Sequence, residues 1–211
     1  MTDWAAPSMF QPGGHGNKPF SVRIPSLLVS CGPDRRANFM TAMWFTAAGA
    51  EPSRLIVAIQ KKSLSYQLVC ATGEFVMSAP PESMMDVIVF AGRISGHKVD
   101  KWAATGLTQV QPSKVAVPLI GEALGNVEYR VVQQIPYDDD MDLFVGEVLC
   151  VHMRHDAMDG ELYTEASAPL LYMGTKYDEN GRSLGKHYGR LSDVQSADYD
   201  SPLLKKYIEY K

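Results

Sequence analysis

Ala37-Asn38-Phe39-Met40-Thr41-Ala42-Met43-Trp44-Phe45-Thr46 is the stretch that decides the fold, and it is followed by Gln60-Lys61-Lys62-Ser63-Leu64-Ser65-Tyr66. The first stretch has the apolar content of a strand, yet it carries an amide, an indole and two hydroxyls that a plain core strand does not need. The second places two lysines and two serines where a strand gives way to a helix. Strand hydroxyls and an amide beside a basic helix start suit a phosphorylated planar ligand.

The first stretch predicts a strand over Asn38–Phe45. Side chains alternate along a strand, so one face is expected to carry every second residue: Asn38, Met40, Ala42, Trp44 and Thr46. An edge strand whose polar face meets water is the simpler alternative. We favour a ligand-binding face because the Trp44 indole is costly on a solvent surface.

Two helix starts carry lysines. Ser63 is the expected N-cap of the first helix, beside Lys61 and Lys62, and Ile94-Ser95-Gly96-His97-Lys98-Val99-Asp100-Lys101 repeats the pattern of small residues and lysines. A capped helix with solvated lysines explains either segment alone. Two such segments in one chain favour convergence on a single anion.

Around these segments the sequence predicts many short strands with helices inserted between them, and a strict βαβ alternation is absent. Strands are expected at Ser26–Cys31, Arg54–Ile59, Glu74–Ala79, Val127–Ile135 and Asp142–Met153, with a loop at Ala47–Pro52. Helices are expected from Ser63 to Gly73, from Pro80 to about Ala91 before Gly92, at Lys98–Ala104 and at Leu203–Tyr210, and Pro169–Leu191 is expected to be irregular or a hairpin. The order favours a mainly β fold, an antiparallel β-barrel with inserted helices.

Composition limits the class of protein. A chain of 211 residues with 45% hydrophobic residues can bury a core, and we expect residues 1–20 to form a flexible arm and 21–211 a single domain. A net charge of −4 provides no basic field for nucleic acid. No apolar run approaches the ~20 residues that a membrane-spanning helix needs.

The sequence offers little for metal binding or acid–base catalysis. Its three cysteines, Cys31, Cys70 and Cys150, are widely spaced and form no metal or disulfide pattern, which favours the reducing cytoplasm. His152 and His155 would face opposite sides of a strand, so a solvated strand end is favoured over a metal site. The methionines Met40 and Met43 are interpreted as core filler. We therefore predict no metal site and name no catalytic side chain.

Several short motifs, taken in order, resemble the flavin reductase-like family, and within it the flavoredoxins, over roughly Pro25 to Val151 and less clearly to about Leu191. The motifs are Asn38-x-x-Thr41-Ala42-x-Trp44-x-Thr46, Lys62-Ser63-x-Ser65-Tyr66, Thr72-Gly73-Glu74-Phe75-Val76, Ser95-Gly96-His97-Lys98-Val99-Asp100-Lys101 and Thr105-Gly106-Leu107-Thr108.

The resemblance implies an FMN-binding split β-barrel that forms a homodimer with flavin near the subunit interface. It places along the flavin Asn38, Thr41, Ala42, Trp44 and Thr46. It places around the phosphate and ribityl chain Lys62, Ser63, Ser65 and Lys101, with Ser95 nearby. Tyr172 matches an aromatic region beside the ring, and between the two adjacent lysines we favour Lys62 over Lys61, because Lys62 adjoins the capping serine.

The function implied is that of an oxidoreductase in which NADH or NADPH passes hydride to bound FMN, and reduced flavin passes electrons to a small-molecule or protein acceptor. An FMN-binding electron-transfer protein with little NAD(P)H activity is the alternative. A ligand-free structural barrel ranks last, because it leaves the polar strand face and both lysine-bearing helix starts unexplained.

Overall fold

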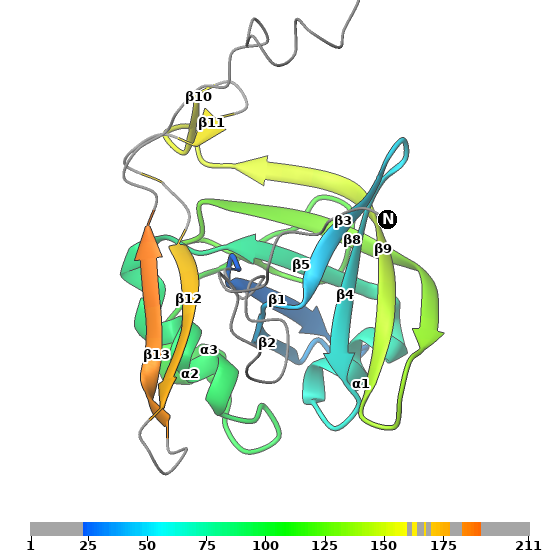
Figure 1. The fold of residues 1–211 in the computed structure, drawn as a ribbon. Helices are drawn as coiled ribbons and strands as arrows, with labels where there is room; N and C mark the ends of the chain where they lie inside the picture. The colour runs from blue at the N-terminus through cyan, green and yellow to red at the C-terminus, as the bar shows by residue number, and fades with distance from the viewer. Residues whose placement is uncertain (1–22, 160–161, 164–166, 168–169, 178–182, 191–211) are drawn as a thin grey trace, which may run out of the picture.

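The computed structural model describes residues 23–159, 162–163, 167, 170–177 and 183–190 (Figure 1). The expected arm at 1–20 and the expected helix at Leu203–Tyr210 lie outside these described residues.

A seven-stranded antiparallel sheet in the order β2-β1-β5-β8-β9-β4-β3 dominates the molecule (Figure 1). Its strands are β1 (Ser26–Cys31), β2 (Ala37–Ala42), β3 (Phe45–Ala50), β4 (Ser53–Gln60), β5 (Glu74–Ala79), β8 (Gly125–Pro136) and β9 (Met141–Met153). Shorter pairs are β6 (Gln109–Val110) with β7 (Leu119–Ile120), β10 (Met158–Asp159) with β11 (Leu162–Tyr163), and β12 (Leu170–Tyr177) with β13 (Ser183–Arg190). The predicted mainly β, antiparallel architecture is confirmed, and Pro169–Leu191 contains the β12–β13 hairpin.

The predicted strand Asn38–Phe45 is wrong, because two strands share that stretch. β2 ends at Ala42 and β3 begins at Phe45, and these consecutive strands lie at opposite edges of the sheet. One straight strand cannot pair with both β1 and β4, so the strand is interrupted at Met43 and Trp44. At this interruption the Trp44 carbonyl accepts a hydrogen bond of 2.9 Å from the Ala58 N–H. The expected loop at Ala47–Pro52 is correspondingly mostly strand.

The sheet curls around one apolar core and packs its outer side against a second. The inner core combines both edges, since Ala42 of β2 lies in one cluster with Val57 of β4 and with Phe75 and Phe144. The side chains on the other face of β1, β2 and β5 pack against α2 and α3 and form the outer core. There the rings of Phe39 and Trp102 meet edge to face, with their centroids 5.1 Å apart. Alternation along β1 sends Leu28 inward and Val29 outward.

Helix α1 (Leu64–Thr72) contacts β1, β2 and β4, and its ends were predicted correctly. The Ser63 hydroxyl accepts a 3.1 Å bond from the Tyr66 N–H, and Gly73 ends the helix at φ +68°. Both caps are local chemistry, which is why the sequence predicts them.

The other helices differ from expectation at their ends. The 3₁₀ turn η3 (Glu82–Met84) leads into α2 (Met85–Arg93), which contains Gly92 rather than stopping before it. A Cβ on Gly92 would lie 3.3 Å from Thr41, so glycine lets α2 pack closely on β2. Helix α3 (Lys101–Thr105) begins later than predicted because Asp100 is its N-cap and accepts from Trp102 N–H and Ala103 N–H. Across the described residues, every helix is too short or too polar to cross a bilayer.

Candidate functional site

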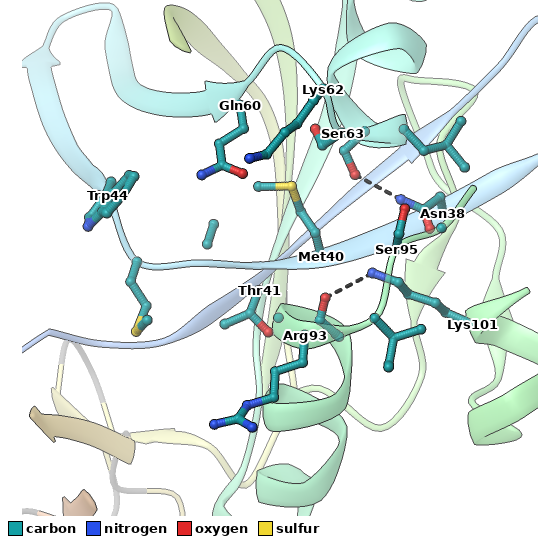
Figure 2. Close-up of a pocket in the computed structure, with 18 of the residues that line it drawn as sticks. Asn38, Met40, Thr41, Trp44, Gln60, Lys62, Ser63, Arg93, Ser95 and Lys101 are labelled. Atoms are coloured by element: carbon teal, nitrogen blue, oxygen red, sulfur yellow. Dashed lines mark hydrogen bonds between the residues drawn. The ribbon is translucent and has the colours of Figure 1, made fainter. Parts of the chain in front are cut away.

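A pocket of about 490 Å³ lies where β2, the start of α1 and the α2–α3 connection meet (Figure 2). Nine predicted site residues line it: Asn38, Thr41, Ala42, Trp44, Lys62, Ser63, Ser65, Ser95 and Lys101. Segments far apart in the sequence thus converge on one cavity, as the two lysine-bearing helix starts suggested. That these residues bind a flavin stays a prediction.

The pocket also contains residues that the sequence interpretation missed. They include Met40, Met43, Ala58, Gln60, Arg93, Ile94 and Met141. The interpretation of Met40 and Met43 as core filler is incomplete, because both side chains contribute to the pocket wall. Their position inside the polar strand was the available signal.

The start of α1 forms the polar end of the pocket. The Ser65 side chain is fully buried, and its hydroxyl oxygen accepts a 2.9 Å bond from the Asn38 amide Nδ2. Since a hydroxyl can accept and donate together, the Ser65 proton is available to an acceptor in the pocket. The first N–H groups of a helix have no intrahelical partner, so this end favours an anion.

The adjacent lysines at this helix start have different roles. Lys62 lines the pocket and points into it near Gln60 and Met40 (Figure 2). The Lys61 ammonium instead lies 3.2 Å from Asp142 Oδ1 and donates to the Asp138 carbonyl at 2.6 Å. Of the two lysines, the favoured Lys62 is thus the one that lines the pocket, and its role at a phosphate stays a prediction.

Asp142 is held ionised behind the α1 start. Its Oδ2 accepts bonds of 2.7 Å from the Tyr66 hydroxyl and 2.8 Å from Gln134 Nε2. These bonds, with the Tyr66 bond the strongest influence and Lys61 a smaller one, lower the Asp142 pKa to about 2. The same bond raises the Tyr66 pKa to about 12. A permanent carboxylate thus keeps Lys61 on the β8–β9 hairpin and out of the pocket.

Lys101 is a buried ammonium at the pocket wall. Only 3% of it is exposed, and its Nζ donates to the Phe39 carbonyl at 2.9 Å and the Ala91 carbonyl at 2.8 Å. Burial lowers its pKa to about 8. Two of its three N–H groups tie β2 to α2, and the third remains for a pocket ligand.

Gly96 brings the α2–α3 connection against β2. A Cβ there would lie 2.3 Å from Asn38 Oδ1, and the Gly96 carbonyl accepts a 3.1 Å bond from the Arg36 guanidinium. The absence of a side chain lets the loop carrying Ser95 close over Asn38. The Asn38 amide is thereby fixed between this loop and Ser65.

Three predicted residues differ from expectation. Trp44 lines the pocket but is 51% exposed, because it sits at the break between β2 and β3 rather than on a continuous strand face. Thr46 is exposed on β3, on the far side of that break, and is absent from the described lining of this pocket. Tyr172 is likewise not among the described lining residues, because its backbone pairs with Arg23 and its ring contacts Tyr188.

A second polar cluster, Glu128, Cys150 and His152, lies outside the pocket lining. Burial disfavours the Glu128 charge, but bonds from the N–H groups of residues 113–115 and from His152 at 2.6 Å outweigh burial and lower its pKa. Each carboxylate oxygen already has two partners, so the cluster serves to anchor the loop at residues 113–115. The expectation that His152 is simply a solvated strand end is wrong.

Comparison with known proteins agrees with this architecture. An uncharacterized protein of Archaeoglobus fulgidus is 32% identical over 148 residues, which cover 70% of this chain and 80% of that protein. The structure of flavoredoxin from Desulfovibrio vulgaris (Miyazaki F) matches with a TM-score of 0.77 at 22% identity, over 92% of this chain and 99% of that chain. An FMN-binding protein from Thermus thermophilus, solved with bound p-hydroxybenzaldehyde, matches with a TM-score of 0.72 at 25% identity, over 94% and 100%.

These matches confirm the predicted fold as an antiparallel split β-barrel. The family model described as flavin reductase like domain matches residues 21–181, most of the chain and all of the strands that build the pocket. The chain therefore belongs to the family of flavin reductase-like domains.

Proposed function

We propose that this protein is an FMN-binding oxidoreductase of the flavin reductase and flavoredoxin type, which passes hydride from NADH or NADPH to flavin and electrons on to an acceptor. One observation carries the proposal: in a flavin reductase-like chain, a pocket of about 490 Å³ is lined at one end by Lys62, Ser63 and Ser65 at a helix start and elsewhere by apolar side chains. The FMN-binding protein of Thermus thermophilus, at 25% identity, supports the choice of cofactor.

The residues present fit FMN at both ends of the pocket. Lys62, Ser65 and the start of α1 supply a cation, a hydroxyl and helix N–H groups suited to a phosphate. Met40, Ala42 and Trp44 supply the apolar contacts that a flat ring needs. The pocket therefore offers hydrogen-bond donors and apolar surface that suit a phosphorylated aromatic ligand. Its volume lies in the range of small-molecule sites.

Each part of the pocket then has a task. Bound FMN supplies the hydride-accepting chemistry. Lys62 and Ser65 hold the phosphate, while Lys101, fixed by two carbonyls, places a second positive charge along the ligand. Asn38, held by Ser65, orients the polar rim of the ligand. The half-exposed Trp44 leaves the apolar end open to a second planar reactant.

We also propose a homodimer in the cytoplasm. The exposed half of Trp44 leaves the apolar end of the pocket uncovered in one chain, and β3, which follows Trp44, is exposed over most of its length. A second subunit would cover both. Cys31, Cys70 and Cys150 are all free thiols, which fits a reducing compartment.

The visible spectrum of the purified protein, recorded without oxygen before and after NADH or NADPH is added, tests the proposal. Flavin absorbance that bleaches on addition is the expected result, and the faster donor identifies the physiological one. A yellow protein that does not bleach would indicate the alternative, an electron carrier reduced by another protein. A colourless protein that gains no thermal stability from added FMN would contradict the proposal.

A further inference from the structure

Arg93 is a pocket residue for which the FMN site gives no role. It lies in the last turn of α2, lines the pocket and is exposed. Within the described part of the chain, its guanidinium has no hydrogen bond or ion pair. Its positive charge acts on the Tyr188 hydroxyl of β13, where it opposes the rise in pKa that burial causes.

Arg93 is separated from the other pocket cations. Figure 2 shows its side chain directed away from Ser95 and Lys101, which lie with Asn38 on the opposite side. Its sequence neighbour Ile94 is 37% exposed, and Trp44 is 51% exposed. The open part of the pocket therefore combines exposed apolar surface with a free guanidinium, whereas the α1 end provides the phosphate site for FMN.

We infer that Arg93 binds a phosphate group of the reduced nicotinamide dinucleotide that delivers hydride to the flavin, an inference that rests on the proposed function. The nicotinamide must reach the flavin ring from the open, apolar end. The phosphates of the dinucleotide then lie outside the α1 site, which is already used by the FMN phosphate. A guanidinium matches phosphate oxygens with two parallel N–H groups and attracts an anionic donor to a protein of net charge −4.

A purely structural role for Arg93 makes a different prediction. An arginine in the last turn of a helix stabilises the helix dipole, and α2 has no other basic residue there. If that were its whole role, its removal would lower the thermal stability of the protein and leave the affinity for the donor unchanged.

Anaerobic stopped-flow reduction of the FMN-loaded protein by NADPH and by NADH distinguishes these roles. In Arg93→Gln the apparent Kd for the donor is expected to rise roughly tenfold or more, with the limiting bleaching rate and the FMN affinity unchanged. Arg130→Gln is the matched control, since Arg130 is an exposed arginine on β8 outside the pocket lining. Arg93→Lys keeps the positive charge but loses the paired N–H groups of the guanidinium, so it should give a smaller rise in the apparent Kd for the donor. It replaces Arg93→Gln in the test if that variant does not fold.

The two donors identify the phosphate. A rise for NADPH alone assigns Arg93 to the 2′-phosphate, and an equal rise for both donors assigns it to the pyrophosphate. An unchanged apparent Kd for both, a change shared by Arg130→Gln, or a parallel loss of FMN affinity would overturn the inference. If wild-type protein binds FMN but neither donor bleaches it, the proposed hydride transfer fails as well, which separates the two failures.

Discussion

Lys101 links packing to ligand binding at the scale of a single residue. Its ammonium is almost fully buried and bound to the carbonyls of Phe39 and Ala91, and burial lowers its pKa from 10.5 to about 8. Bringing an anion beside it offsets the cost of burying its charge. The protonation of Lys101 and the binding of the FMN phosphate should therefore be coupled.

We expect the FMN affinity of the wild-type protein to fall as the pH rises through about 8, because Lys101 then loses the charge that faces the ligand. Calorimetric titration from about pH 7 to about pH 9.5 measures this, and Lys101→Met should bind more weakly with little pH dependence over that range. A wild-type affinity that is flat across the range would contradict a role for Lys101 in holding the anion.

Without ligand, the same pKa has the opposite effect on folding. Between pH 8 and 10.5 the unfolded chain keeps a proton on Lys101 that the folded chain loses, so the free energy of unfolding rises with pH relative to Lys101→Met. The effect is complete above the unfolded pKa of 10.5 and absent below about 8. Urea unfolding of both proteins at several pH values provides the check.

The pair Lys61 and Lys62 gives a second residue-scale prediction with a built-in control. Lys62→Gln should weaken FMN binding by about 1–3 kcal/mol, the range for a charge-assisted bond, and leave the stability of the free protein nearly unchanged. Lys61→Gln should have the reverse effect, because Lys61 forms an ion pair with Asp142 and donates to the Asp138 backbone carbonyl rather than facing the pocket. Equal losses of FMN affinity in the two variants would contradict the distinct roles.

At this scale the sequence predicts what local chemistry determines. Capping rules predict that Ser63 begins the helix and that Gly73 ends it. The position of Lys62 at the helix start is then predicted because Lys62 adjoins Ser63. The burial of Lys101 could not be predicted, because it depends on α2 packing over β2, far away in the chain. Arg93 was missed because a basic residue at a helix end has an ordinary explanation in the helix dipole.

At the scale of elements, the break between β2 and β3 determines the shape of the site. The sequence indicates a strand through Met43 and Trp44, since their composition is that of a strand. It is divided because β2 pairs with β1 and β3 pairs with β4, and these two pairs lie at opposite ends of the strand order, which composition does not reveal. The same division explains why Trp44 reaches the pocket while Thr46, two residues later, does not.

Glu128 of β8 carries the element-scale prediction. It is fully buried and accepts from the N–H groups of Ser113, Lys114 and Val115 and from His152, so it ties the loop to the sheet. Glu128→Gln should destabilise the fold by about 1–3 kcal/mol, because an amide nitrogen replaces one acceptor and faces an N–H donor.

Hydrogen exchange is expected to show the largest loss of protection at residues 113–115, with FMN binding retained because this loop does not line the pocket. Uniform loss of protection throughout the sheet would mean that Glu128 supports the whole core rather than this loop. Glu74→Gln is a matched control, since Glu74 accepts a single N–H, that of Ala116, within the part of the chain that the structure describes, and is less buried.

At the scale of the whole molecule, the uncovered apolar end of the pocket leads to an expectation about assembly. We expect light scattering after gel filtration to give twice the 23.3 kDa of one chain. The substitution Trp44→Ala should weaken both the association of the two subunits and the binding of FMN, since half of the Trp44 side chain is exposed beside the pocket. A monomer that still binds FMN tightly would contradict the homodimer.

The curled sheet also affects how long the molecule stays folded. Its two edge strands are separated in the chain only by Met43 and Trp44, and the pocket wall includes residues of β2, of that junction and of β4. A ligand there contacts parts of the pocket wall that come together only in the folded sheet, so it stabilises the folded state and has no comparable site on the unfolded chain. We therefore expect bound FMN to slow unfolding while leaving the folding rate unchanged, so that cofactor supply sets the lifetime of each folded molecule.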